Sequence, residues 1–265
     1  MIGGERVVAL VPARGGSESV PNKNVQPLDG KPLVGWAIDV AAATDAVDRV
    51  VVSTDDERIA ATAREFDAEV IDRPPELARD DSLVIDTIRH TVDELSRRGE
   101  TAQYMVMLEP TCPLREPRDV QDCLSRLDGE AALDSVATFK PAEVNPHRTW
   151  RLDDGRLPEP FVEGANPWLP RQKLPEAYQL NGAVYAFDVD AIPEGGVSLL
   201  FGESGAVTMP PERSVDIDTA VDFATAEAVL EASGRGSTPT PAPTTAEAPP
   251  ETNGGGPARE HPDGG

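Results

Sequence analysis

A short apolar run near the N-terminus constrains the fold more than any other stretch of the chain. Val7–Val11 read VVALV, Pro12 ends the run, and Gly15-Gly16 follows a few residues later. An uninterrupted apolar run of this length is typical of a strand buried on both faces of a parallel sheet. Ligands of open parallel sheets bind beyond the carboxyl ends of the strands, so we expect a binding site in the loop that follows.

Predicted strands alternate with predicted helices through the first half of the chain. Apolar runs predict further strands at 48–53, 69–71, 104–108 and 135–139. Helical spacing predicts helices at about 33–41, 57–66, 85–95 and 117–127. We expect Asp55 or Asp56 to cap the second of these helices, and Asp81 or Ser82 to cap the third. This alternation argues for an α/β fold whose mostly parallel sheet is covered by helices on both faces.

The alternation breaks between about residues 141 and 180, where Pro, Trp and Arg are frequent. Residues 150–157 read WRLDDGRL, which predicts a hairpin with Asp-Gly at its turn. We interpret this stretch as an insertion that projects from the sheet. Leaving Trp150, Phe161 and Trp168 in water would be costly, so we expect them to pack on another subunit. The alternative is that the insertion folds back on its own domain.

The C-terminal part of the chain ends in a polar tail. Two more strands are predicted at 183–187 and 206–209, and a helix at 219–232. No large apolar residue follows Leu230, and residues 233–265 are rich in Pro, Gly, Thr and Glu. Such a segment cannot bury enough surface to fold, so we predict a disordered tail. We therefore assign 1–232 to one domain that contains the 141–180 insertion.

The charge balance excludes two classes of partner. The chain has 24 Lys plus Arg against 47 Asp plus Glu, a net charge of −23. Nucleic acids and membrane surfaces are polyanionic, so we expect neither as a partner. The acids are spread along the chain, which favours a solvated acidic shell of the kind suited to high salt. An acidic interaction surface is the alternative.

Cysteine usage and hydropathy indicate a cytoplasmic protein. Cys112 and Cys123 have neither a metal-type spacing nor a disulfide framework, so we expect reduced thiols. No stretch approaches the ~18–20 apolar residues that a membrane span needs. The N-terminal apolar run is too short for a signal peptide, and Pro12 interrupts it.

The loop after the first strand has the composition of a phosphate-binding loop. Glycines let the backbone approach a phosphate, and exposed N–H groups can cradle it. Arg14 and Lys23 can neutralise the charges of a nucleoside triphosphate. Neither the Walker A sequence nor the dinucleotide fingerprint Gly-x-Gly-x-x-Gly is present. The alternative is an ordinary glycine-rich turn with two surface cations.

Two later groups complete the candidate site. Asp216 and Asp218 alternate along an extended segment, so both carboxylates can face one Mg²⁺; an ordinary surface pair is the alternative. Arg171, Asn181 and Tyr185 form the second group, because Arg can bind a carboxylate bidentately. A salt bridge for Arg171 and a plain turn at Asn181 are the alternatives.

Six stretches, taken in order, resemble the motifs of the acylneuraminate cytidylyltransferases, or CMP-sialic acid synthetases. They are VPARGGSESVPNKN, VVVSTDDERIA, RPPELARDDS, LEPTCPLR, LPEAYQLNGAVY and PERSVDIDT, spanning about residues 7–230. The resemblance implies a Rossmann-like nucleotidyltransferase three-layer sandwich with an inserted dimerisation arm. It also implies that CMP is transferred from CTP to the anomeric hydroxyl of a sialic-acid-like nonulosonic acid, with release of pyrophosphate.

The resemblance implies roles for individual residues, carried over motif by motif. Nucleotide-binding residues would be Ala13, Arg14, Gly15, Ser17, Lys23, Asn24, Arg73 and Ser82. Sugar-binding residues would be Glu109, Arg171, Asn181 and Tyr185. Metal ligands for Mg²⁺ would be Asp216 and Asp218. Arg14, Lys23 and Asp218 would act in catalysis, because charge on the phosphates must be stabilised during in-line transfer. The insertion would form a homodimer.

Three residues depart from the family pattern. Glu18 stands where the family usually has Lys, Glu109 where it has Gln, and Cys112 where it has Ser. Glu18 reverses a charge near the expected triphosphate, and Glu109 would repel a sugar carboxylate or add a metal ligand. These changes favour a sugar other than sialic acid, and they leave a nucleotide other than CTP as an alternative. The alternatives are a same-fold nucleotidyltransferase for another nucleotide or a 3-deoxy-octulosonate, and a non-catalytic relative that binds nucleotide or sugar.

Overall fold

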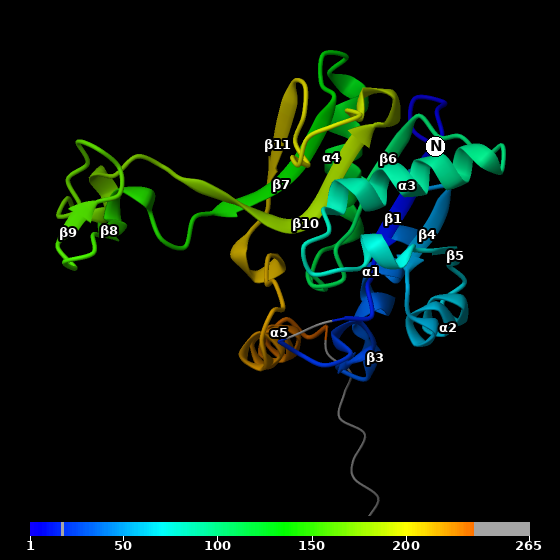
Figure 1. The fold of residues 1–265 in the computed structure, drawn as a ribbon, viewed down its shortest axis with the longest axis horizontal. Coiled ribbons are helices and arrows are strands. Elements are labelled where there is room, and N and C mark those ends of the chain that lie inside the picture. The colour runs from blue at the N-terminus through cyan, green and yellow to red at the C-terminus, as the bar shows by residue number, and fades with distance from the viewer. Residues whose placement is uncertain (17–18, 236–265) are drawn as a thin grey trace, which may run out of the picture.

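The computed structural model describes residues 1–16 and 19–235, and a seven-stranded sheet forms its centre (Figure 1). The strands lie in the order β11, β7, β10, β6, β1, β4, β5. Within this sheet β10 alone is antiparallel to its neighbours. The predicted mostly parallel sheet is therefore confirmed. The strand bounds are β1 Val7–Pro12, β4 Arg49–Thr54, β5 Glu69–Asp72, β6 Tyr104–Met107, β7 Ser135–Pro141, β10 Tyr178–Asp188 and β11 Ser204–Thr208.

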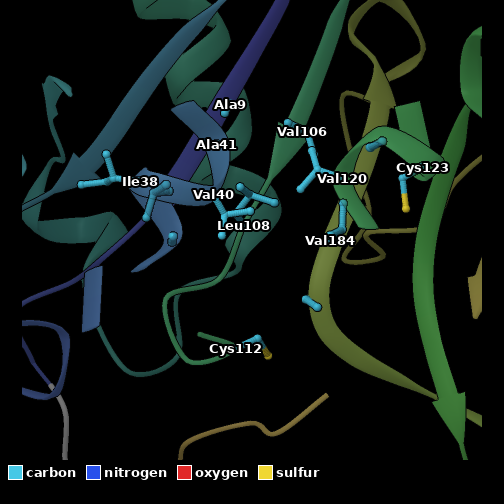
Figure 2. Packing of buried hydrophobic residues seen from close by; sticks show 14 of the residues in the cluster. Ala9, Ile38, Val40, Ala41, Val106, Leu108, Cys112, Val120, Cys123 and Val184 are labelled. Carbon is cyan, nitrogen blue, oxygen red and sulfur yellow. The ribbon is translucent and has the colours of Figure 1, made fainter. Parts of the chain in front are cut away.

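Helices cover both faces of this sheet. α1 (Leu33–Ala42), α2 (Glu57–Glu65) and α4 (Pro117–Gly129) share one apolar cluster with the odd-numbered residues of β1 (Figure 2). α3 (Val84–Arg97) shares another cluster with the even-numbered residues of β1. The result is the expected three-layer sandwich.

The central strand β1 explains why its sequence shows no alternation. It pairs in parallel with β4 on one side and with β6 on the other. Residues Val7 to Val11 are at most 3% exposed, because each face of the strand is covered by a helical layer. Burial on both faces replaces the polar positions of a half-exposed strand with apolar ones.

A small third cluster fixes the last helix beside the sheet. α5 (Ala220–Ala232) packs on the hairpin of β2 (Pro27–Leu28) and β3 (Lys31–Pro32). Its N-terminus carries a capping box between Thr219 and Asp222. This capping fixes the segment just before the helix, which contains the predicted metal ligands.

The two predicted helix caps have different outcomes. Asp56 caps α2, and its carboxylate accepts a hydrogen bond from the Arg58 amide at 2.8 Å. The predicted cap of α3 is wrong, because that helix starts after Leu83 without a side-chain cap. Ser82 instead closes the preceding loop: its hydroxyl accepts from the Arg79 amide at 3.0 Å and donates to the Glu76 carbonyl at 2.9 Å.

The chain between β7 and β10 forms an arm that projects from the body (Figure 1). The predicted hairpin is present as β8 (Trp150–Leu152) and β9 (Pro158–Pro160), which pair antiparallel. Phe161 and Trp168 are 64% and 83% exposed, and the rings of Trp150 and Trp168 lie 6.1 Å apart. The arm therefore does not fold back on its own domain, and its aromatic side chains remain uncovered in the single chain.

Some predictions concern residues outside the described ranges. These are Ser17 and Glu18 of the first loop, and most of the predicted tail, of which the structure describes only 233–235. Among the described helices, none combines the length and the apolar character that crossing a membrane would require.

Candidate active site

A cleft of about 320 Å³ opens at the carboxyl end of the sheet. From β1 the chain passes to β4 and β5 on one side and then returns to β6 on the other. Such a switch point, between β1 and β6, is where open α/β sheets bind ligands. The loops after β1, β5 and β6 contribute most of the lining, which comprises Pro12, Arg14, Gly16, Lys23, Asn24, Arg73, Leu77, Arg79, Asp80, Ser82, Val84, Thr87, Glu109, Pro110 and Thr111.

Arg14 lies in the cleft but is already engaged by the loop after β5. Its Nη1 donates to Asp80 Oδ1 at 2.5 Å and to the Ala78 carbonyl at 3.4 Å. Asn24, a predicted nucleotide contact, donates its side-chain amide to the Arg14 carbonyl at 2.9 Å. Asn24 therefore positions the backbone of Arg14, and a bound phosphate must compete with Asp80 for the guanidinium.

The glycine pair has two separate functions. The Gly15 amide donates to Asp55 at 2.9 Å, and a Cβ on Gly15 would lie only 2.7 Å from Asp56 Oδ2. Gly15 is thus required by the close approach of the loop to the start of α2. Gly16 lines the cleft, and a Cβ there would contact only Arg14 Nη1, at 3.9 Å. Ala13 is buried, and its amide donates to the Ser53 carbonyl.

Lys23 joins the two predicted groups that lie farthest apart in the sequence. It begins a short 3₁₀ helix, Lys23–Val25. Its Nζ donates to the Ile217 carbonyl at 2.9 Å and pairs with Asp218 at 3.0 Å. The expected phosphate loop and the expected metal ligands therefore form one continuous site.

Arg73 is a buried cation at the floor of the cleft. Its guanidinium donates to the Ser53 carbonyl at 2.7 Å and to the Ser53 hydroxyl at 3.3 Å. Burial lowers the pKa of Arg73 to about 10, Asp55 opposes this shift and Arg14 adds to it. Arg73 therefore remains charged at neutral pH and gives the floor of the cleft a fixed positive charge.

Glu109 follows β6 and is the most perturbed acid of the cleft. Its pKa is raised to about 7, first by burial and then by the negative charge of Asp216; Arg115 and Lys23 oppose the shift. Gly182, at φ +69°, faces it: a Cβ there would lie 3.0 Å from Glu109 Oε2. The glycine thus leaves room for the Glu109 carboxylate.

Two neighbours define the environment of Glu109. Arg115 is fully buried and donates through Nη2 to the Glu109 carbonyl, while its Nε and Nη1 have no hydrogen-bond partner among the described residues. Tyr185 is 6% exposed, and burial followed by the charge of Glu109 raises its pKa. Tyr185 does not line the cleft.

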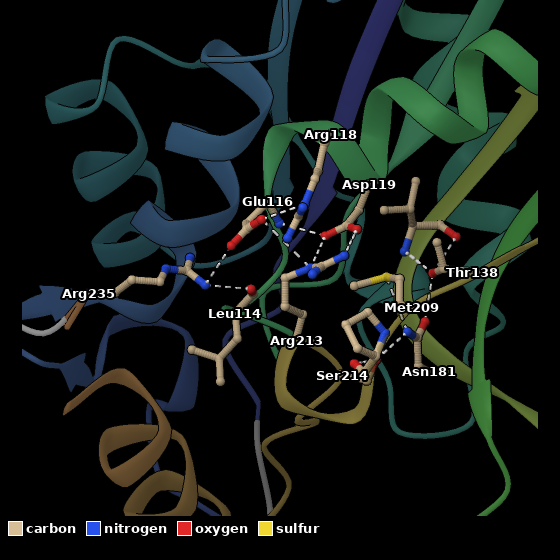
Figure 3. Close-up of polar contacts among 12 residues, drawn as sticks. Leu114, Glu116, Arg118, Asp119, Thr138, Asn181, Met209, Arg213, Ser214 and Arg235 are labelled. Carbon is tan, nitrogen blue, oxygen red and sulfur yellow. Dashed lines mark hydrogen bonds and ion pairs between the residues drawn. The ribbon is translucent and has the colours of Figure 1, made fainter. Parts of the chain in front are cut away.

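Asn181 is buried in an internal network rather than in the cleft wall (Figure 3). Its oxygen accepts from the Thr138 hydroxyl at 2.6 Å and from the Ala183 amide at 3.2 Å. Its nitrogen donates to the Ser214 hydroxyl at 2.9 Å and to the Met209 sulfur at 3.3 Å. All four hydrogen-bonding positions are used, so this conformation leaves none for a sugar. The geometry makes Asn181 a positioning residue for the segment that leads to Asp216.

The same segment has a second anchor, visible in Figure 3. Arg213 forms a bidentate ion pair with the buried carboxylate of Asp119, at 2.7 and 3.0 Å. The Ile217 amide then donates to the Thr111 carbonyl at 2.8 Å, which ties the segment to the loop after β6. These contacts hold Asp216 and Asp218 at the edge of the cleft.

The two aspartates face a second cavity, of about 550 Å³, on the side of the arm. The pKa of Asp216 is raised by desolvation and by the like charge of Asp218, and a hydrogen bond from Thr111 opposes the shift. Arg171 lines the same cavity from the arm. Within the described residues its side chain makes no ion pair, so the alternative of a salt bridge is not observed.

Three residues of this region have no role in the assignments made from the sequence. Asp80 pairs with Arg14, Arg79 lines the cleft, and Arg115 lies beneath Glu109. All three belong to stretches that carried the resemblance, RPPELARDDS and LEPTCPLR. All three residues therefore belong to the matched motifs, but the sequence alone does not show which residue of a charged run points into the cleft.

Comparisons with known proteins agree with the fold. A family model described as "Cytidylyltransferase" matches residues 8–188. N-acylneuraminate cytidylyltransferase A of Danio rerio is 32% identical over 223 residues, which cover 83% of this chain and 50% of that protein. CMP-N,N'-diacetyllegionaminic acid synthase of Legionella pneumophila is 30% identical over 231 residues, covering 85% of this chain and 97% of that protein.

Two solved structures share the fold. CMP:2-keto-3-deoxy-manno-octonic acid synthetase complexed with CTP superposes with a TM-score of 0.64 at 18% identity, covering 86% of this chain and 99% of that chain. For 4-diphosphocytidyl-2C-methyl-D-erythritol synthase of Anaerococcus prevotii the TM-score is 0.58 at 14% identity, covering 87% and 98%.

A three-layer α/β sandwich with a cationic cleft at its switch point defines a protein of the nucleotidyltransferase fold. The chain belongs to the cytidylyltransferase family, so the resemblance read from the six motifs is confirmed. It spans about half the length of the two Danio rerio relatives.

Proposed function

We propose that the protein transfers CMP from CTP to the anomeric hydroxyl of a sialic-acid-like nonulosonic acid. The observation that carries this proposal is the continuous site in which Lys23 of the cationic cleft pairs with Asp218. The relatives named for N-acylneuraminate and N,N'-diacetyllegionaminic acid support an acidic nine-carbon sugar as acceptor.

The proposed reaction is an in-line displacement at the α-phosphate of CTP. The oxygen of the sugar hydroxyl forms a bond to the α-phosphorus and its proton passes to water, while the bond from that phosphorus to the bridging oxygen breaks and pyrophosphate leaves. Arg14, Lys23 and Arg73 stabilise charge on the phosphates. In the present structure Arg14 and Lys23 are paired with Asp80 and Asp218. CTP must therefore share these cations with the two carboxylates or displace the carboxylates when it binds.

Asp216 and Asp218 suit Mg²⁺ as part of a ligand set. They offer hard oxygen donors, and the repulsion between them that raises the pKa of Asp216 would be relieved by a cation. The described residues contain no group of three or more His, Cys, Asp or Glu able to hold a metal. Substrate phosphates and water would therefore complete the set. Bound Mg²⁺ supplies charge neutralisation at the phosphates.

The acceptor is proposed to occupy the second cavity, between the aspartates and the arm. Arg171 would bind the carboxylate of the sugar, and Glu109 and Tyr185 would lie beside it. Asn181 would act by holding the wall of this region rather than by contact. Because the fold is similar to that of CMP:2-keto-3-deoxy-manno-octonic acid synthetase, a 3-deoxy-octulosonate is the second candidate acceptor.

Pyrophosphate release tests the proposed function directly. The full chain is incubated with CTP, Mg²⁺ and a panel of nonulosonic acids plus a 3-deoxy-octulosonate, at high ionic strength because of its net charge of −23. Release with at least one nonulosonate, and not with ATP, GTP or UTP, is the expected result. No release with any acceptor would overturn the proposal, and release with the octulosonate alone would replace the acceptor.

The exposed aromatic residues support a homodimer formed through the arm. Trp residues dominate the energetics of many interfaces, and Trp168 is 83% exposed in the single chain. We expect Trp168→Ser to weaken dimerisation about 30-fold or more. Sedimentation analysis over a range of protein concentrations measures this. Val197→Ser, an exposed apolar change outside the arm, is the matched control. A dimer equally stable in both variants would remove the arm from the interface.

A further inference from the structure

Arg79 is the cation of the cleft that remains available to a ligand. Arg14 pairs with Asp80, Lys23 pairs with Asp218, and Arg73 is bonded to Ser53. Among the described residues the Arg79 guanidinium has neither an ion pair nor a hydrogen bond, although its side chain lines the cleft.

The backbone around Arg79 is nevertheless fixed. Its amide donates to the Ser82 hydroxyl at 3.0 Å, and that hydroxyl donates to the Glu76 carbonyl at 2.9 Å. On the other side, Arg14 reaches the Ala78 carbonyl at 3.4 Å. The backbone is thus already ordered, whereas the side chain is free to bind. This order lowers the entropy cost of binding a ligand, because the loop need not be ordered at that step.

The charge balance shows what such a side chain can bind. Asp80 and Asp218 each neutralise one cation, and the loop after β1 also carries the acid Glu18. Arg14 and Lys23 each already have a counter-ion, which a nucleoside triphosphate must share or displace when it binds them. Arg79 can donate to a phosphate without breaking any existing bond, and guanidinium groups suit phosphate oxygens.

We propose that Arg79 binds the polyphosphate of the nucleotide and helps to position it for transfer. This assignment rests on the proposed function for the identity of the nucleotide, but its charge argument applies to any polyphosphate in the cleft. Because its guanidinium has no counter-ion among the described residues, Arg79 offers the polyphosphate a positive charge that no carboxylate offsets.

Calorimetric titration of the full chain with CTP, CMP and inorganic tripolyphosphate tests the assignment. We expect Arg79→Ala to weaken binding of CTP and tripolyphosphate about 10- to 100-fold, the effect of losing a charged hydrogen bond. Binding of CMP should change by less than about twofold. Arg79→Lys should retain part of the affinity. Arg97→Ala, which removes an exposed Arg at the end of α3, should change none of these affinities.

Two outcomes would overturn the assignment. Unchanged affinity of Arg79→Ala for tripolyphosphate would remove Arg79 from the polyphosphate site. An equal loss for CTP and CMP would place it at the base or ribose instead. Failure of the proposed function is distinguishable, because wild-type protein would then bind tripolyphosphate in an Arg79-dependent manner but would not prefer CTP over other nucleotides.

Discussion

Replacement of Asp218 by Asn is expected to lower turnover about a hundredfold or more while the protein stays folded. Asp218 is exposed and contacts Lys23, so the change removes a proposed oxygen ligand of Mg²⁺ and also the partner of Lys23, the cation proposed to bind phosphate. Losses of this size follow removal of one preorganised electrostatic group. Helix α5 should persist, because its capping box uses Thr219 and Asp222.

The measurement is steady-state pyrophosphate release as a function of Mg²⁺ concentration. If Asp218 holds the metal, its variant should need more Mg²⁺ as well as turning over more slowly. The matched control is Asp39→Asn on helix α1, which removes another exposed carboxylate that is paired with a lysine, Lys31 of β3. Full activity of Asp218→Asn at limiting Mg²⁺ would remove Asp218 from both the metal site and the catalytic set.

The sheet and its helices could be predicted because each element has a local signature. The run at β1 shows burial on both faces, and the spacing in α3 shows one apolar stripe. The order of the strands has no local signature. Consequently the contact between Lys23 and Asp218, nearly two hundred residues apart, could be expected only from the family resemblance.

The detailed roles within the site were harder to predict because polar side chains have several competing partners. Ser82 fits the pattern of a helix cap, yet its hydroxyl is used to close the loop before α3. Asn181 fits the pattern of a sugar ligand, yet buried neighbours use all of its amide. Sequence identifies the residue type, whereas burial decides whether its hydrogen-bonding atoms remain free.

The presence of Asp80 in the cleft also could not be predicted from composition. Acids are spread along the whole chain, so the sequence gives no reason to single out Asp80. In the structure Asp80 neutralises Arg14 within the cleft that is expected to bind an anion. Asp80 therefore offsets one cation of the cleft, whereas Arg79 has no such counter-ion among the described residues.

Replacement of Glu109 by Gln is expected to stabilise the fold at alkaline pH and to leave it unchanged at acid pH. The pKa of Glu109 rises from 4.5 in the unfolded chain to about 7 in the fold, mainly through burial. The folded state therefore binds this proton more tightly than the unfolded state. Wild-type stability should fall as pH rises from about 4.5 to 7, and this contribution should level off above that range.

The expected difference in the free energy of unfolding between Glu109→Gln and wild type follows from the size of the pKa shift. At 1.36 kcal/mol per pKa unit, the free energy of unfolding of Glu109→Gln should exceed that of wild type by about 3 kcal/mol above pH 7. Urea denaturation at constant salt, without Mg²⁺, measures the difference at each pH. Glu227→Gln, an exposed change on α5, should show no such trend. A difference independent of pH would show that Glu109 does not carry this titration.

The same titration should affect binding of the acidic acceptor. Above pH 7 an ionised Glu109 would repel the carboxylate of the sugar, so the KM for the sugar should rise with pH in wild type. In Glu109→Gln this rise should be absent, because glutamine is neutral throughout. If both proteins show the same pH dependence of KM, the sugar carboxylate lies away from Glu109, and Arg171 would then hold it nearer the arm.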